Sequence, residues 1–240
     1  MSVFVLVHGT SCGSWIWRYL SPLLRAAGHD VYAPTLTGLG ANSHLVERIE
    51  RISLATHIQD VTNMLFYEDL SEVVLVGNSY AGMVITGVAA TAPQRLAHVV
   101  YLDAYVPLQG EREMDLWPPE EQARVRAEIA KGNRFRPLPP NFPAFLGIAD
   151  PKLAEWLEQR LTPHPLSTYE DPPPQGAESL SVPRTFIHCT GGPTAPIFEV
   201  FASRARGLGW KVVELPAGHA AMVTNPRQLT EILLGIAGEQ

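Results

Sequence analysis

The sequence predicts an α/β fold in which a mostly parallel, doubly wound sheet is covered by helices on both faces. Several short segments are apolar at every position, which is typical of strands buried on both faces. These segments alternate with longer ones of helical periodicity, as in a chain built from strand–helix–strand units. The length of 240 residues is enough for one such domain with a large core.

The composition is that of a folded globular protein. Hydrophobic residues make up 46% of the chain and charged residues 18%, which excludes a disordered chain. The net charge is −6 and no run is rich in lysine and arginine, so we do not expect a nucleic-acid partner. The apolar residues 1–7 lack a basic segment and a cleavage site, which favours a strand over a signal peptide. No stretch has the length of a membrane span, so we expect no membrane partner either.

The two cysteines, Cys12 and Cys189, lie far apart in the sequence and exclude a disulfide framework. We therefore expect a cytoplasmic protein. The histidines lack the spacing of metal ligands, and two cysteines cannot build a usual zinc site. Neither a metal nor a cofactor is expected.

The first part of the chain alternates strands and helices. The predicted elements, in order, are strand 3–7, helix 15–27 ending at Gly28, strand 30–33, helix 53–69, strand 73–77, helix 80–92 and strand 98–102. Ser53 is a candidate N-cap of the fourth of these elements.

The character of the chain changes after residue 107. Residues 108–183 are rich in proline, show no strand signal and hold two predicted helices, 120–131 and 152–161. The alternation then resumes with strand 184–189, helix 196–208, strand 211–215 and helix 226–237. We therefore expect a core made of residues 1–107 and 184–240, with residues 108–183 inserted as a cap over the carboxyl ends of the strands.

Ser79 is the first candidate for a catalytic residue. It lies in the run VVLVGNSYAG, where an apolar strand stops at Gly77 and a helical segment starts directly after the serine. This strand–turn–helix context is typical of a nucleophile elbow, which needs small residues on both sides of the serine. Gly77 meets that need on one side, and Ala81 and Gly82 on the other. A serine that merely caps an ordinary helix is the alternative.

His219 is the candidate base, since a serine hydroxyl becomes a good nucleophile only beside a group that takes its proton. It follows the last predicted strand in a loop of small residues, at the edge where parallel sheets bind ligands. A surface histidine is the alternative. At the end of the first strand, the glycine-containing turn from His8 can aim a backbone N–H at an oxyanion, and Tyr80, directly after Ser79, can supply a second. For His8 itself we expect a structural role.

Five stretches of the chain resemble the α/β-hydrolases, and more narrowly the plant methylesterases and hydroxynitrile lyases with their bacterial esterase relatives. They are FVLVHG at 4–9, PLLRAAGH at 22–29, VLVGNS at 74–79, RTFIHCT at 184–190 and GH at 218–219. The resemblance implies an α/β-hydrolase fold with a helical cap inserted after the sixth strand. It also implies Ser79 as nucleophile, His219 as base, and the amides of Thr10 and Tyr80 as the oxyanion hole.

The triad acid is the main departure from this pattern. Most of the group carry an aspartate after strand 184–189, but here residues 189–196 read CTGGPTAP and contain no carboxylate. Asp103 is the obvious substitute, because it ends the strand after the elbow helix, where some α/β-hydrolases carry their acid. A carboxylate there could hold the Nδ1 side of the histidine. Asp103 could instead cap the following turn, and Asp150, Asp171 and Glu199 remain candidates.

The resemblance favours a serine ester hydrolase. The lyases use a threonine after the first-strand histidine and a lysine after the catalytic histidine, where this chain has Gly9 and Ala220. A hydroxynitrile-type lyase is the first alternative, and a binding protein that kept the fold but lost catalysis is the second. A homodimer is expected only by analogy with the related plant enzymes.

The expected substrates are small-to-medium hydrophobic esters of the methyl, aryl or carbamate type. The inserted segment offers an apolar, partly aromatic lining, and no basic cluster is expected near the site. Residues expected to line the pocket come from the first turn and the inserted segment: Gly9, Ser11, Cys12, Trp117 and Trp156.

Overall fold

The computed structural model describes residues 1–238, and the main sheet in this part of the chain is entirely parallel. Its strand order is β2-β1-β3-β4-β7-β8. The six predicted strands are all present: β1 Val3–Val7, β2 Asp30–Tyr32, β3 Val73–Ser79, β4 Leu96–Ala104, β7 Arg184–Cys189 and β8 Lys211–Leu215. Parallel pairing requires a crossover between strands, and the helices supply it.

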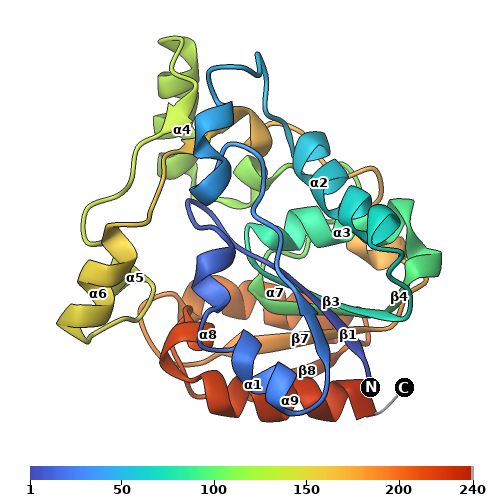
Figure 1. Cartoon of the computed structure of the whole chain (residues 1–240). Helices are drawn as coiled ribbons and strands as arrows, with labels where there is room; N and C mark the ends of the chain where they lie inside the picture. The colour runs from blue at the N-terminus through green and yellow to red at the C-terminus, as the bar shows by residue number, and fades with distance from the viewer. Residues whose placement is uncertain (239–240) are drawn as a thin grey trace.

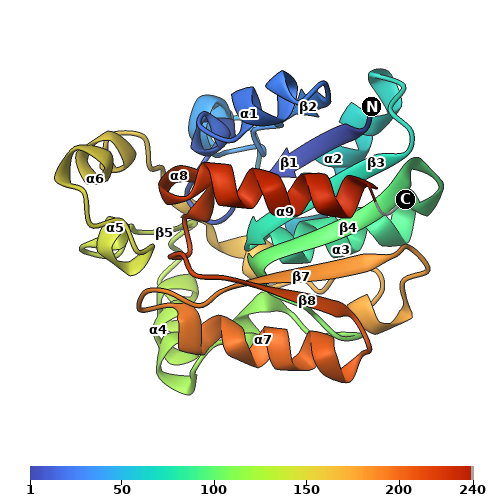
Figure 2. The same cartoon turned by 90° about the horizontal axis from the view of Figure 1, so that it is seen from below.

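Helices cover both faces of this sheet, as Figures 1 and 2 show. Alternate residues of a strand point to opposite faces. In β3, Val73 and Leu75 belong to the apolar cluster on one face, and Val74 and Val76 to the cluster on the other. The first face carries α2 Leu54–Tyr67, α3 Ala81–Thr91 and α7 Ala195–Gly207, and the second carries α1 Ser21–Ala26, α8 Ala221–Thr224 and α9 Pro226–Gly238.

Local sequence signals explain where several helices begin. The Ser53 side chain accepts a hydrogen bond from the N–H of Thr56, and the N–H of Ser53 donates in turn to Oγ1 of Thr56. Such a capping box satisfies two N–H groups at the helix start, and losing an N-cap costs about 1 kcal/mol. The predicted helix 15–27 is wrong in one respect: it is broken into a 3₁₀ turn, Ser14–Trp17, and α1. Pro22 is the cause, because it has no N–H to donate to the preceding turn.

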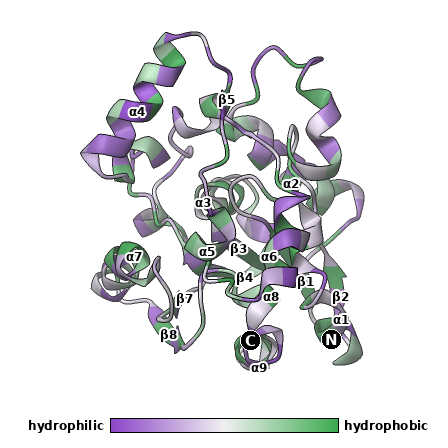
Figure 3. Cartoon of the chain, turned by 90° about the vertical axis from the view of Figure 1, so that its left-hand side faces the viewer, coloured by the Kyte–Doolittle hydropathy of each residue, from purple (hydrophilic) through white to green (hydrophobic). Residues whose placement is uncertain are grey.

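The inserted segment lies beyond the carboxyl ends of the strands, toward which the arrowheads of Figure 2 point. It holds α4 Pro119–Ala130, α5 Phe142–Phe145 and α6 Pro151–Glu158, the last capped by the Asp150 side chain. Figure 3 shows that α4 is largely hydrophilic, and Val125 is its buried residue.

Two expectations for this segment need correction. Strands β5 Phe135–Arg136 and β6 His164–Pro165 pair antiparallel within it, although no strand was expected. Two residues are too few for an alternating pattern to be recognised in sequence. Only three strands, β1, β2 and β3, precede β4. The segment therefore follows the fourth strand of this chain and not the sixth, which the resemblance implied. Within residues 1–238, no helix is both long enough and apolar enough to cross a membrane.

Candidate active site

A cavity of about 370 Å³ lies where the carboxyl ends of the strands meet the inserted segment. The core contributes Ser79 and His219 to its lining, together with Gly9 and Thr10 from the turn after β1. The inserted segment contributes aromatic and charged side chains, Trp117 among them. Residues from the two parts of the chain therefore enclose one space, and the predicted nucleophile and base both face it.

Ser79 occupies a strained turn between β3 and α3. Its φ is +58°, in the left-handed region that L-residues with a Cβ rarely adopt. The Ser79 carbonyl accepts from the N–H of Tyr105, which ties the turn to the end of β4. A Cβ added to Gly9 would lie 2.9 Å from the Ser79 Cβ, so the first turn packs directly against the serine. Strain held in this way is typical of functional sites.

Glycines make the elbow possible by letting α3 pass close to its neighbours. A Cβ on Gly77 would lie 2.8 Å from the Ile85 side chain and 3.0 Å from the carbonyl oxygen of Ala81. A Cβ on Gly82 would lie 2.0 Å from the carbonyl oxygen of Tyr105. Gly82 is therefore required where α3 crosses the end of β4, while the alanine at position 81 is accommodated.

Asp103 and His219 meet inside the protein. The exposed fraction is 0% for Asp103 and 3% for His219, and Nδ1 of His219 lies 2.7 Å from Oδ2 of Asp103. A carboxylate can only accept, so Nδ1 carries the proton and Nε2 is left as the acceptor. The imidazole also stacks on the Phe198 ring, with centroids 4.5 Å apart. The ring is thus fixed from its face and from its Nδ1 edge.

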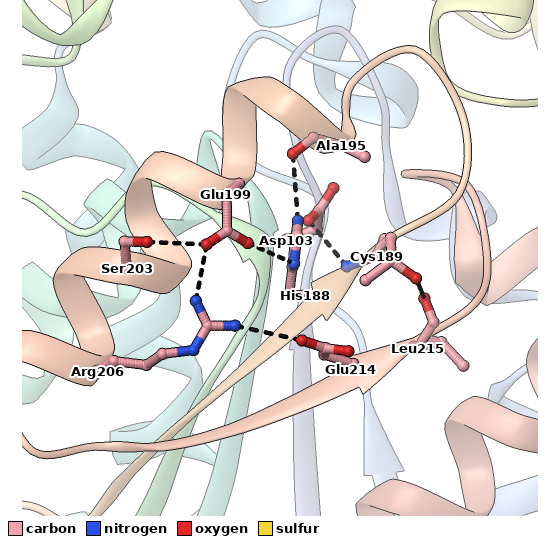
Figure 4. Close-up of polar contacts among 10 residues, drawn as sticks. Asp103, His188, Cys189, Ala195, Glu199, Ser203, Arg206, Glu214 and Leu215 are labelled. Carbon is pink, nitrogen blue, oxygen red and sulfur yellow. Dashed lines mark hydrogen bonds and ion pairs between the residues drawn. The ribbon is translucent and has the colours of Figure 1, made fainter.

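Residues 189–196, which contain no carboxylate, contribute to the site through a backbone N–H. The N–H of Cys189 donates to Oδ1 of Asp103 over 3.0 Å, as Figure 4 shows. The N–H of Gly191 donates to the carbonyl of Ala217, and a Cβ at Gly191 would lie 3.1 Å from that residue's backbone. This loop therefore packs closely on the loop of His219 and supplies Asp103 with a backbone donor.

The other candidate acids are engaged elsewhere. Asp150 caps α6, and Asp171 forms an ion pair with Arg51 over 2.8 Å. Glu199 pairs with His188 and Arg206 on the α7 side of the sheet (Figure 4). Among the four candidates, Asp103 is the one in contact with His219.

The turn after β1, which is predicted to supply an oxyanion donor, is held in place by the buried side chain of His8. His8 donates from Nδ1 to the carbonyl of Gly9 over 3.0 Å and accepts the N–H of Leu36 on Nε2 over 3.1 Å. Burial lowers the pKa of His8 to about 4, so the ring is neutral at pH 7 and holds the turn that carries Thr10. The structural role expected for His8 agrees with this geometry.

Tyr80 places its backbone at the start of α3 and its side chain in the interior. Its hydroxyl lies 2.7 Å from Nδ1 of His57, whose Nε2 lies 2.9 Å from the carbonyl of Thr37. A carbonyl only accepts, so Nε2 donates to it and Nδ1 accepts from the tyrosine hydroxyl. Burial lowers the pKa of His57 to about 3. The residue after Ser79 is therefore anchored by a neutral hydrogen-bonded pair.

Three of the five residues expected in the pocket line the cavity: Gly9, Cys12 and Trp117. Burial raises the pKa of the Cys12 thiol to about 12, so it is not ionised and is a poor nucleophile. Ser11 and Trp156 lie outside the lining, which corrects their assignment. Ser11 turns inward and donates its N–H to His164 over 3.2 Å. The Trp156 ring packs on Trp15.

The cavity also holds residues that the sequence did not reveal. Its apolar lining includes Phe142, Phe145 and Leu146 from the inserted segment, as its aromatic content suggested, but also Tyr105, Phe198 and Met222. No basic cluster was expected here, and the two arginines of the lining are balanced by two glutamates. Arg124 and Arg136 line the cavity beside Glu113 and Glu121. These charges are scattered over the sequence and form a cluster only through folding, so no local run marks them. Within residues 1–238, no group of three or more histidine, cysteine, aspartate or glutamate side chains is placed to hold a metal ion.

Comparison with known proteins gives consistent matches along the chain. A family model described as "Alpha/beta hydrolase family" matches residues 4–232. A carbendazim-hydrolysing esterase of Nocardioides sp. (strain SG-4G) is 39% identical over 248 residues, covering 98% of this chain and 100% of that protein. Salicylic acid-binding protein 2 of Nicotiana tabacum is 31% identical, covering 98% of this chain and 96% of that protein.

Solved structures agree with these relatives. An extracellular α/β-hydrolase from a Paenibacillus species superposes with a TM-score of 0.84 at 25% identity, covering 98% of both chains. Polyneuridine aldehyde esterase superposes with a TM-score of 0.80 at 25% identity, covering 99% of both chains. The similarity therefore extends over the sheet and the inserted segment alike.

Proposed function

This chain belongs to the alpha/beta hydrolase family, and we propose that it hydrolyses small-to-medium hydrophobic esters through a Ser79–His219–Asp103 triad and an acyl-enzyme. Two relatives that match nearly the whole chain are named as esterases, the carbendazim-hydrolysing esterase and polyneuridine aldehyde esterase. The observation that carries the triad is the buried hydrogen bond between His219 and Asp103, at the wall of the cavity that Ser79 also lines.

The reaction follows from this arrangement. Oγ of Ser79 attacks the ester carbonyl while Nε2 of His219 takes the hydroxyl proton, and Asp103 stabilises the imidazolium that forms. The N–H groups of Thr10 and Tyr80 hold the oxyanion of the tetrahedral intermediate, where losing one donor costs about 3 kcal/mol. His219 then gives its proton to the departing alcohol. Water, activated by the same nitrogen, hydrolyses the acyl-enzyme and restores Ser79.

The lining of the cavity supports the substrate class. Phe142, Phe145 and Leu146 form an apolar surface that fits an alkyl or aryl group. The relative named for carbendazim hydrolysis supports including carbamate-type esters among methyl and aryl esters. Acyl-enzyme chemistry serves all three types.

The structure weighs against a lyase. A Cβ at Gly9 already meets Ser79 at 2.9 Å, so a threonine at this position would need the turn to move. Position 220 lines the cavity but carries an alanine, so the lysine that the lyases use next to the catalytic histidine is absent from the site. The non-catalytic alternative is opposed by the contact between His219 and Asp103, which a binding protein does not need.

Turnover of p-nitrophenyl acetate and butyrate by the wild type and by Ser79→Ala tests the proposal, together with labelling by an organophosphate. We expect turnover that is lost in Ser79→Ala, and a label on the peptide that contains Ser79. A wild type with neither turnover nor label would refute the hydrolase mechanism. Cyanide release from mandelonitrile without ester turnover would favour the lyase.

A cytoplasmic location and a homodimer are further parts of the proposal. Both cysteines are unpaired in the structure, which fits a reducing compartment. Cell fractionation tests the location, and sedimentation at micromolar concentration tests the dimer.

A further inference from the structure

Glu113 is a buried carboxyl in the wall of the cavity. It begins the 3₁₀ turn Glu113–Leu116 and is 1% exposed, yet it lines the space that holds Ser79 and His219. Its Oε2 is buried and has no hydrogen-bond partner among the described residues. An unpaired buried polar atom costs about 1–3 kcal/mol, so such an atom beside a cavity calls for an explanation.

Arg136 faces the same cavity from β5. One of its terminal nitrogens pairs with Glu121, while its Nε is buried and has no partner in the part of the chain described. The Arg136 guanidinium lies 5.1 Å from the centre of the Trp117 ring, which holds it against the wall. Both unpaired atoms are buried in the wall of the cavity, so a ligand can bond to them only if it displaces the side chains that cover them.

The charge state of Glu113 determines what it can bind. Burial raises the pKa of Glu113 to about 8, although the nearby Arg136 works against that rise. At pH 7 the group is thus mostly a neutral carboxylic acid, which offers one O–H donor and one carbonyl acceptor. A group with an N–H next to an acceptor would satisfy both at once.

We propose that Glu113 and Arg136 form a polar recognition subsite, which selects planar esters that carry an N–H group beside a carbonyl or ring nitrogen. The N–H donates to the Glu113 carboxyl, and the neighbouring acceptor receives the carboxyl proton or the Nε–H of Arg136. The rings of Phe142 and Phe145 supply the apolar surface for the rest of the substrate. That the ligand is an ester rests on the proposed function, but the subsite itself does not.

Direct binding tests the subsite without any turnover. The probes are quinolin-2(1H)-one, which is planar and carries an N–H beside a carbonyl, and 1-methylquinolin-2-one, which lacks the N–H. Calorimetry at pH 7 should show the wild type binding the first at least 10-fold more tightly, since an unpaired buried group costs this much. The preference should fall to less than 3-fold in Glu113→Leu and persist in part in Glu113→Gln. Glu120→Gln, an exposed residue of α4, should keep the full preference.

Two results would overturn the proposal: equal affinities of the wild type for the two probes, or an undiminished preference in Glu113→Leu. If Glu113→Leu does not fold, the wild-type comparison still decides.

An activity test separates this inference from the proposed function. The ratio of kcat/KM for 2-oxo-1,2-dihydroquinolin-6-yl acetate over 2-naphthyl acetate should fall at least 10-fold in Glu113→Leu and stay constant in Glu120→Gln. If the probes are distinguished but neither ester is hydrolysed, the subsite stands and the esterase proposal fails. If both esters are hydrolysed with an unchanged ratio, the subsite fails and the esterase proposal stands.

Discussion

The Nδ1–H of His219 donates to Oδ2 of Asp103 over 2.7 Å, although the two residues are 116 positions apart. Asp103 lies near the end of β4 and His219 follows β8, so the contact passes over β7, which lies between them in the sheet. The N–H of Cys189, at the end of β7, holds the other oxygen of the carboxylate. The carboxylate is therefore fixed at both oxygens before any substrate binds.

Replacing Asp103 by asparagine should reduce kcat on p-nitrophenyl acetate by about 10⁴-fold. The amide can donate a proton as well as accept one, so it no longer selects the tautomer with the proton on Nδ1. Asp171→Asn, which removes only an exposed ion pair with Arg51, should leave kcat unchanged. If kcat of Asp103→Asn lies within 10-fold of the wild-type value, Asp103 is not the triad acid.

Ser79→Gly should be more stable than Ser79→Ala. At a φ of +58° a Cβ costs about 1 kcal/mol, which glycine avoids, and both variants lose the hydroxyl. Ser203, in the middle of α7, is a matched control, because glycine there should be less stable than alanine by about 1 kcal/mol. Thermal unfolding of the four variants measures both differences. The same order at the two positions would show that Ser79 is not strained.

The sequence predicted most accurately the features that depend on neighbouring residues. The strand that enters the elbow and the cap at Ser53 are local patterns, and both appear where expected. The break before Pro22 could have been read from the same kind of signal but was missed. Asp103 and His219 could be named as candidates, whereas their hydrogen bond depends on the order of β4, β7 and β8.

The lining of the cavity was predicted less well, because it depends on how distant segments pack. Trp156 is an aromatic residue of the inserted segment and was therefore expected in the pocket lining, but its ring packs against Trp15 instead. Glu113 and Arg136 are 23 positions apart and come together only when β5 pairs with β6. A two-residue strand leaves no periodicity in the sequence, so the polar wall could not be foreseen.

Gly82→Ala should destabilise the protein, although alanine is the better helix former by about 1 kcal/mol. The new methyl group would meet the carbonyl oxygen of Tyr105 at 2.0 Å and force α3 away from the end of β4. Overpacking of this kind costs about 1–3 kcal/mol, and the shifted elbow should also lower kcat. In contrast, Gly235→Ala in α9, where a Cβ meets no atom within 4 Å, should be stabilising. Denaturation with urea compares the two, and equal effects would contradict the close approach at Gly82.

Glu113 should make the stability of the protein depend on pH in a way that Glu113→Gln abolishes. The pKa of Glu113 is about 8 in the folded state, compared with 4.5 for an unperturbed glutamate, which represents the unfolded chain. Between these values the folded protein binds more protons than the unfolded chain, so the free energy of unfolding decreases as pH rises. The stabilising contribution of Glu113 to the free energy of unfolding is fully present below pH 4.5 and is lost as the pH rises through 8.

The loss amounts to at most about 1.4 kcal/mol for each pH unit in that window. Urea denaturation of the wild type and of Glu113→Gln, at pH 5 and pH 9, isolates the effect, because the other titrating groups cancel in the difference. We expect the wild type to lose more stability than the variant between the two values. A difference that does not change with pH would mean that the carboxyl is already ionised at pH 5, in which case it binds a substrate N–H as a charged acceptor and has no proton to donate.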